Sequence, residues 1–172
     1  MITMTSGEIL HEIPCPGCGL ALPHREFANG HAYYNASREC WLLYAEVLGT
    51  QYSDAVLFGH AHQLTVDAYA VQHAGGAHPD KSVGIHLCGL YLLLERGYNH
   101  SLLPPLRQSL ATSIGRWPRF TPPTRSSART IVDLALAGSP TEHIAIARDW
   151  AAAVWAAWAD HHAVVAALVS PF

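Results

Sequence analysis

Residues 62–86, which read HQLTVDAYAVQHAGGAHPDKSVGIH, decide the predicted fold because they contain the end of one helix, a turn and the start of a second helix. Asp54, together with the serine before it, is a typical N-cap, and the helical pattern after it runs to about Ala74. The pair Gly75-Gly76 ends this helix, and the next one is predicted to begin after Ser82. The stretch therefore predicts a helical hairpin.

Ionisable side chains are predicted to meet at the joint of this hairpin. The end of the first helix faces the start of the second, so His73 and His86 should lie close together. They are candidates for metal ligands or for general bases. Asp67, which lies between the two apolar faces of the first helix, is expected to orient a neighbouring imidazole. His62 is interpreted as a core histidine with a hydrogen-bond partner.

Cys15 and Cys18, in the segment CPGCG, form the strongest local motif. Two thiolates at this spacing can bind one tetrahedral zinc ion, and the glycines permit the tight turn. Such a knuckle supplies half of a closed zinc site, and the nearest candidates for the remaining ligands are His24, His31 and Cys40. A second CxxC motif is missing, so a redox dithiol or a plain turn is the alternative interpretation.

Cys40 is predicted to lie in the first turn of a helix whose N-cap is Ser37. The unpaired amides and the dipole of a first turn stabilise a thiolate, so Cys40 is a candidate for the third zinc ligand or for a nucleophile. The alternative is a small core residue, since free cysteine is commonly buried.

The last helix is predicted to begin at Ser139-Pro140, with serine as the cap and proline in the first helical position. Its apolar stripe includes His161, which should therefore face inward, with His162 at the edge of the stripe. An insertion rich in proline and arginine precedes this helix. Its Arg/Trp strip, from Arg107 to Arg129, is a candidate surface for a protein or nucleic acid, although scattered arginines usually belong to a solvated connection.

Together these elements predict one all-α domain, an up-down four-helix bundle with an N-terminal zinc-knuckle loop and a Pro-rich insertion before the last helix. The loop covers residues 1–36, three helices cover 37–97, the insertion covers 98–138 and a long C-terminal helix covers 139–169. The candidate ligands would then lie towards one end of the bundle. Two arrangements follow: one zinc ion held by the three cysteines and one histidine, or that site plus a separate site of His73, His86 and His161 or His162.

Composition narrows the class of protein. The chain has 172 residues, of which half are hydrophobic and 13% are charged, enough for one compact domain. A net charge of -3 argues against a protein that coats nucleic acid or an anionic membrane. Neither a signal peptide nor a run of ~20 apolar residues is evident, so a cytoplasmic protein is expected. The expected partners are a small-molecule substrate and a second copy of the chain in a homodimer, without nucleic acid or membrane.

Several motifs together resemble a known family. They are CPGCG, HAYYNASRECW, YAEVLGTQYS, HQLTVDAYAVQH and SVGIHLCGLYLLLERG, followed by a WP turn and a WAxxVWxAW helix. As a set they resemble an uncharacterised bacterial family of unknown function, which implies no established chemistry.

In architecture alone, the chain also resembles the DinB and YfiT-like four-helix bundles. That resemblance implies a metal site of three histidines at one end of the bundle, with His73 or His62 and His161 as the corresponding positions. Those proteins usually carry an HxxxH motif on one helix, whereas this chain has the adjacent pair His161-His162.

The sequence therefore predicts a zinc-binding helical protein, with a metal-dependent enzyme acting on a small molecule as the extended hypothesis. In that enzyme His73 and His86 would be ligands or general bases, His161 a third ligand and Asp67 the orienting carboxylate. The alternative is a non-catalytic binding module with a structural zinc ion and the Arg/Trp strip as its interaction surface.

Overall fold

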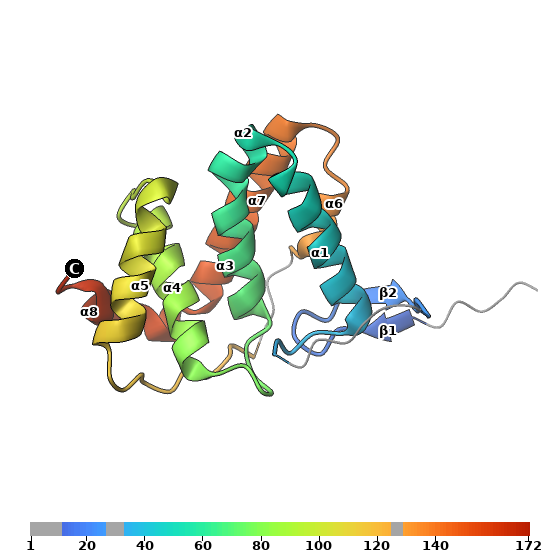
Figure 1. Ribbon diagram of the computed structural model, residues 1–172. Coiled ribbons are helices and arrows are strands. Elements are labelled where there is room, and N and C mark those ends of the chain that lie inside the picture. Colours follow the sequence, from blue (N-terminus) through green and yellow to red (C-terminus); the bar gives the residue numbers. More distant parts are fainter. Residues whose placement is uncertain (1–11, 27–32, 125–128) are drawn as a thin grey trace, which may run out of the picture.

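The computed structural model describes residues 12–26, 33–124 and 129–172 (Figure 1). Helices dominate it, which confirms the all-α class, although the specific up-down four-helix arrangement is not confirmed. The α-helices are α1 (Arg38–Tyr52), α2 (Ala55–Leu57), α3 (Gln63–Gln72), α4 (Asp80–Leu94), α5 (Leu103–Ser113), α6 (Ile131–Ala135), α7 (Pro140–Ala157) and α8 (His162–Val169). A π-helical turn, η1 (Phe58–His62), joins α2 to α3, and 3-10 turns precede α5 (His100–Leu102) and α8 (Ala159–His161).

Helix α3 is the centre of the molecule. It packs against α4 on one side and α7 on another, and nearly all of its residues are buried, as its two apolar faces predict. Helix α4 also contacts α5 and α8, while α1 packs mainly on α6 and η1. The fold therefore surrounds one buried helix with shorter elements.

Helices α1 and α3 converge near α2 and diverge towards the β-hairpin (Figure 1). Aromatic side chains fill the space between them: the rings of Tyr44 and Tyr69 stack with centroids 3.9 Å apart, and Trp41 packs on both rings. Large rings hold the two backbones apart. The N-terminal segment, coloured blue, lies at the wide end of this angle.

That segment was predicted to be a loop, but its described part forms a short antiparallel hairpin. Strand β1 (Glu12–Pro14) pairs with β2 (Ala21–Pro23), with Ile13 opposite Leu22. The CPGCG motif is the turn of the hairpin. A two-stranded hairpin is marginal on its own, so contacts at its closed end must hold it.

Helix starts were predicted better than helix ends. Ser37, Asp54 and Ser139 are N-caps whose side chains accept backbone N–H bonds in the structure. Gly49 is a possible end signal in the sequence, but α1 continues through it to Tyr52. A glycine costs a helix only about 1 kcal/mol, which packing offsets here.

The predicted single helix over residues 139–169 is wrong, because α7 and α8 meet at 69°. Trp158, 1% exposed, ends α7 in a non-helical conformation. The carbonyl of Trp155 accepts from the Trp158 amide and from Nε2 of His162, whose ring stacks on the Trp155 indole. These bonds satisfy the broken end of α7 and redirect the chain.

Among the described residues, no single helix is both long and apolar enough to cross a membrane, and α7 and α8 reach that length and composition only as a bent pair.

Candidate metal centre

Four buried side chains meet at the wide end of the angle between α1 and α3. Cys15 and Cys18 come from the hairpin turn, Cys40 from the first turn of α1, and His73 from the C-cap of α3. One donor atom of each lies within 4.8 Å of all the others. The exposed fractions are 2%, 7%, 0% and 0% in that order. The three cysteines and the histidine therefore form a closed cluster.

Glycine makes the hairpin turn fit against α3. A Cβ on Gly17 would lie 2.4 Å from the carbonyl oxygen of Asn35 and 2.7 Å from Cδ2 of His73. Gly19 has φ +77°, a conformation that glycine adopts without strain, and its N–H donates to the carbonyl of Cys15 at 2.8 Å. The CPGCG sequence thus permits both the turn and its contact with His73.

The start of α1 brings Cys40 to the cluster. The side chain of Ser37 accepts the amide N–H of Cys40 at 3.2 Å and fixes the first turn. The backbone N–H of Ser37 donates to Sγ of Cys15 at 3.4 Å. Sγ of Cys15 therefore lies beside the positive end of a helix, which favours its thiolate form.

The imidazole of His73 is oriented by its own helix. Its Nδ1–H donates to the carbonyl of Tyr69 at 2.8 Å, so Nε2 is the nitrogen that faces the cysteines and that would bind a metal ion after losing its proton. Nε2 lies 3.4 Å from Sγ of Cys40, and the hydroxyl of Tyr69 donates to the same sulfur at 3.6 Å. One residue, Tyr69, thus positions two members of the cluster.

The observed distances match tetrahedral zinc coordination. Bond lengths of about 2.3 Å for Zn–S and about 2.0 Å for Zn–N require S···S near 3.8 Å and S···N near 3.5 Å. Sγ of Cys18 and Sγ of Cys40 are 3.9 Å apart, and the Cys40 to His73 distance is 3.4 Å. These two distances are therefore those of a tetrahedral site, and the remaining donor pairs lie within 4.8 Å of one another.

The electrostatics of the cluster also favour a cation. Hydrogen bonds from the thiols of Cys18 and Cys40 lower the pKa of Cys15. Burial opposes protonation of His73, yet the sulfur atoms of Cys15 and Cys18 outweigh it and raise its pKa to about 9. Hydrogen bonds to Cys15 and Cys18, together with burial, raise the pKa of Cys40. A metal dication would displace the remaining thiol and imidazolium protons of this buried cluster, as zinc binding requires.

Comparison with known proteins gives the family. The model of the Family of unknown function (DUF5946) matches residues 13–159. The chain belongs to the DUF5946 family. This match confirms the resemblance seen in the motifs, and it spans all four residues of the cluster. No curated protein and no solved structure matches this DUF5946 chain, so the DinB-like architecture is not confirmed.

Two of the predicted metal ligands of the chain, His86 and His161, are not in the cluster. His86 donates from Nδ1 to Asp67 at 2.7 Å, and Nε2 of His161 contacts the carbonyl of Thr121 at 3.1 Å. The bend after α7 explains why His161 lies elsewhere, and His73 is turned towards the cysteines. His31 lies outside the described residues. Among the described residues, the predicted site of His73, His86 and His161 does not form.

Asp67 and His86 are paired, as the orienting role predicted for Asp67 requires. The carboxylate is fully buried, and its Oδ1 accepts from both His86 and Arg107. Sequence reasoning missed Arg107, which was placed in the Arg/Trp strip. A signal existed: Arg107 stands four residues after Leu103 and three before Leu110, both fully buried, so it lies on the inner face of α5.

Two aromatic residues of the Arg/Trp strip, Trp117 and Phe120, also pack inward. Trp117 packs where Gly84 has no side chain, since a Cβ there would be 2.4 Å from the indole ring. Phe120 is 4% exposed. Phe120 therefore belongs to the core, and the half-buried Trp117 packs against it.

Proposed function

We propose that this protein binds one Zn²⁺ ion at Cys15, Cys18, Cys40 and His73, and that the ion is structural. The observation that carries the proposal is the set of four buried donor atoms, all within 4.8 Å of one another. Thiolate sulfur and imidazole nitrogen in a tetrahedral arrangement are the donors that zinc prefers in proteins.

A structural role follows from the closed coordination. Four protein ligands fill a tetrahedral site, whereas catalytic zinc sites have three protein ligands and an open position. All four residues are buried, so a substrate would have to displace a ligand to reach the ion. We therefore propose that any chemistry of this protein takes place away from the metal.

The position of the centre supports this role. Its ligands join the N-terminal hairpin to the first turn of α1 and the last turn of α3, at the end where these helices diverge (Figure 1). A short hairpin lacks the contacts to stay folded alone. The ion would supply the missing cross-link, as it does in small zinc domains, where binding contributes about 10–16 kcal/mol to folding.

The alternative binding module has no specific support beyond the exposed arginines Arg116 and Arg119. Arg107 is bound to Asp67, and Trp117 and Phe120 pack inward. The metal-dependent enzyme would need an open coordination position, which the four donors do not leave.

The test is the metal content of protein purified without a histidine tag. We compare the wild type, the double variant Cys15→Ser/Cys18→Ser and the control Cys88→Ala, because Cys88 is fully buried but outside the cluster. We expect one zinc ion per chain in the wild type and control, and none in the double variant, together with a lower melting temperature. A metal-free wild type with a reversible Cys15–Cys18 disulfide would refute zinc binding, and full zinc content in the double variant would refute this ligand set.

A further inference from the structure

A second cluster of polar side chains lies in the core, apart from the metal centre. Asp67 of α3 is 0% exposed, and its Oδ1 accepts hydrogen bonds from Nδ1 of His86 on α4, at 2.7 Å, and from Arg107 on α5. Three helices thus bring together an anionic carboxylate, a cationic guanidinium and an imidazole. None of these residues belongs to the metal cluster.

The fold leaves space for this cluster at a definite position. A Cβ on Gly89 would lie 2.4 Å from Oδ2 of Asp67 and 2.6 Å from the guanidinium of Arg107. A buried ion pair seldom stabilises a protein more than apolar side chains of similar volume would. The cluster also leaves Oδ2 of Asp67 and Nε of Arg107 buried without a hydrogen-bond partner, which adds to its energetic cost. Stability alone does not explain it.

The contacts of His86 determine its chemical state. A carboxylate accepts, so Nδ1 carries the proton and Nε2 carries a lone pair. Arg107 stays cationic, because burial lowers its pKa only to about 10, and it balances the charge of Asp67. Burial lowers the pKa of His86 to about 4, so the ring is neutral at pH 7. A neutral imidazole held by a carboxylate is the arrangement of a general base.

The lone pair of His86 can be reached from outside. Nε2 has no hydrogen-bond partner in residues 12–26, 33–124 and 129–172, and it is not among the fully buried unpaired atoms. The side chain keeps 13% of its surface exposed, while Asp67 beneath it keeps none. The base therefore faces solvent and the carboxylate that orients it does not.

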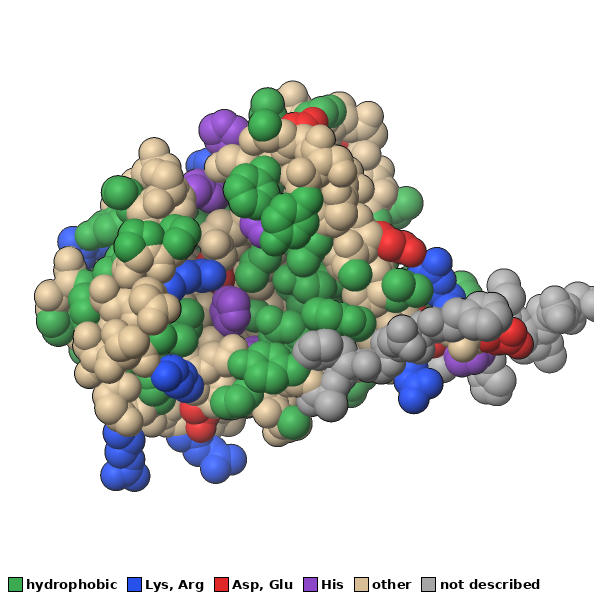
Figure 2. All heavy atoms as spheres, viewed as in Figure 1, with side chains coloured by type: hydrophobic (Ala, Val, Ile, Leu, Met, Phe, Trp, Pro, Cys, Tyr) green, Lys and Arg blue, Asp and Glu red, His purple; other side chains and the backbone are tan. Residues whose placement is uncertain are grey.

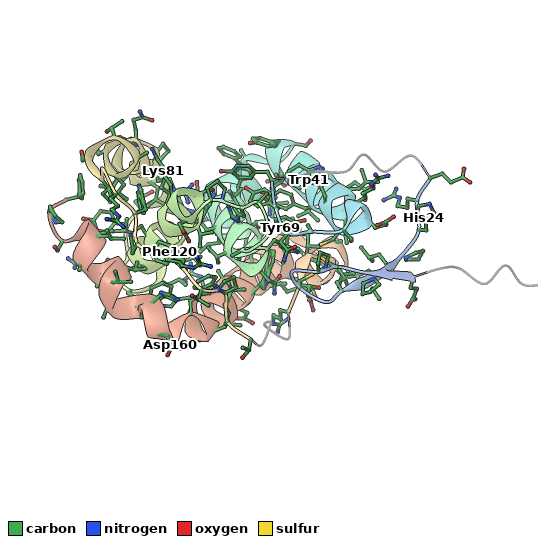
Figure 3. The ribbon with its side chains drawn as sticks, turned by 90° about the horizontal axis from the view of Figure 1, so that it is seen from below. His24, Trp41, Tyr69, Lys81, Phe120 and Asp160 are labelled. Atoms are coloured by element: carbon green, nitrogen blue, oxygen red, sulfur yellow. The ribbon has the colours of Figure 1, made fainter. Side chains whose placement is uncertain are left out.

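Aromatic rings adjoin this position. The ring of His78 lies 6.5 Å from that of His86 and 4.8 Å from that of Tyr34, which also packs on Trp41 at 5.7 Å. Figure 2 shows hydrophobic side chains gathered over α1 and α3, with histidine and basic side chains beside them towards α4. Figure 3 shows Tyr69 between the central helices and Trp41 on the side away from Asp160. His78 is itself 6% exposed, so the half-buried ring of Tyr34 is the aromatic surface that a planar molecule beside His86 would meet.

We propose that Asp67, His86 and Arg107 form a metal-independent proton-transfer site for a planar, aromatic small molecule, in which Nε2 of His86 is the general base. His86 is the catalytic residue, since it faces the substrate. Asp67 and Arg107 are positioning residues: Asp67 fixes the tautomer of His86, and Arg107 holds Asp67. This inference goes beyond the zinc centre, and its proton acceptor is held by residues outside that centre.

The probe is 5-nitrobenzisoxazole, a planar compound with an acidic ring C–H. Nε2 of His86 takes the proton from the ring carbon, and the electron pair of that C–H bond forms the third carbon–nitrogen bond of a nitrile. The N–O bond breaks with its electron pair going to oxygen, which gives a coloured cyanonitrophenolate. The imidazolium then returns the proton to water. No oxidant, reductant or metal is needed. We compare the wild type with His86→Ala, Asp67→Asn and the control His60→Ala, since His60 is exposed on η1.

We expect His86→Ala to lose about 100-fold in rate, a typical contribution of general-base catalysis, and His60→Ala to match the wild type. Asp67→Asn should lower kcat with little change in KM. Equal rates in the wild type and His86→Ala would overturn the proposal. A second measurement needs no variant: the ¹⁵N NMR spectrum of the wild type should show His86 protonated on Nδ1, and protonation on Nε2 alone would overturn it. Zinc content, measured in every sample, separates this result from that of the metal centre.

Discussion

Gly17→Ala should damage the metal centre more than any other single methyl group added to the hairpin turn. The new Cβ would lie 2.4 Å from the carbonyl oxygen of Asn35 and 2.7 Å from the ring of His73. Both neighbours are held: the amide N–H of Asn35 donates to the carbonyl of His73 at 3.0 Å, and the ring of His73 is bonded to Tyr69. The turn itself must therefore move.

The size of this movement can be worked out from the contact. The Cβ must retreat by about 0.6 Å to reach 3.0 Å from the oxygen, whereas metal–ligand distances tolerate only about 0.2 Å. Cys18 follows Gly17 directly and would be carried out of bonding distance. Loss of one well-placed thiolate should weaken zinc binding at least about 100-fold, or about 2.7 kcal/mol.

The assay is a competition titration of Zn²⁺ against a chromophoric chelator. Gly19→Ala is the matched control, because it adds a methyl group to the same turn with nothing within 4 Å. Its only expected cost in stability comes from placing an alanine at a φ of +77°. We expect the control to bind zinc nearly as the wild type does and to lose about 1 kcal/mol of stability. If Gly17→Ala bound zinc as tightly as Gly19→Ala, the packing of this turn against His73 would not govern the site.

Three further predictions can be checked by thermal or chemical unfolding. Removal of zinc by a chelator should lower the melting temperature, and added Zn²⁺ should restore it; an unchanged melting temperature would contradict a structural role. Burial lowers the pKa of His143 in the folded protein below its value of about 6.5 in the unfolded chain. The unfolded chain therefore binds more protons than the folded protein in acid. The free energy of unfolding should fall as the pH drops below about 6.5. His143→Gln should show a smaller fall over that pH range, and an equal fall would assign the effect to other groups. Gly89→Ala should cost about 1–3 kcal/mol by displacing Asp67 and Arg107, whereas Gly59→Ala, which meets nothing within 4 Å, should be neutral or stabilising; equal effects would argue against the crowding.

The features that the sequence predicts correctly are those fixed by local contacts. Ser37 caps α1 through a hydrogen bond to a residue three positions away, so the residues adjacent in sequence suffice to predict the cap. The spacing of Cys15 and Cys18 likewise depends only on the turn between them. The end of α7 is different, because the burial of Trp158 and the bonds of His162 to the Trp155 carbonyl involve the packed core.

The partners of each histidine could not be read from spacing. His73 and His86 were both predicted at the joint of the hairpin, and both lie near it, but they face different neighbours. His73 turns to the cysteines because the Tyr69 carbonyl fixes its ring and Gly17 lets the knuckle approach. His86 turns to Asp67, which is also held by Arg107, 40 positions away along the chain. The spacing from Leu103 and Leu110 places Arg107 on the inner face of its helix, but no periodicity identifies Asp67 as its partner.

Helix α3 connects the two sites physically. His73 at its end belongs to the metal cluster, and Asp67, almost two turns earlier, holds His86. Tyr69 lies between them, with its hydroxyl on Cys40 and its ring against Tyr34, the residue that adjoins His78 and the outer side of the base. A metal that fixes α1 against the end of α3 would therefore also fix the aromatic surface beside His86. Zinc would shape the place where a planar molecule stacks, while the proton acceptor itself depends only on Asp67 and Arg107.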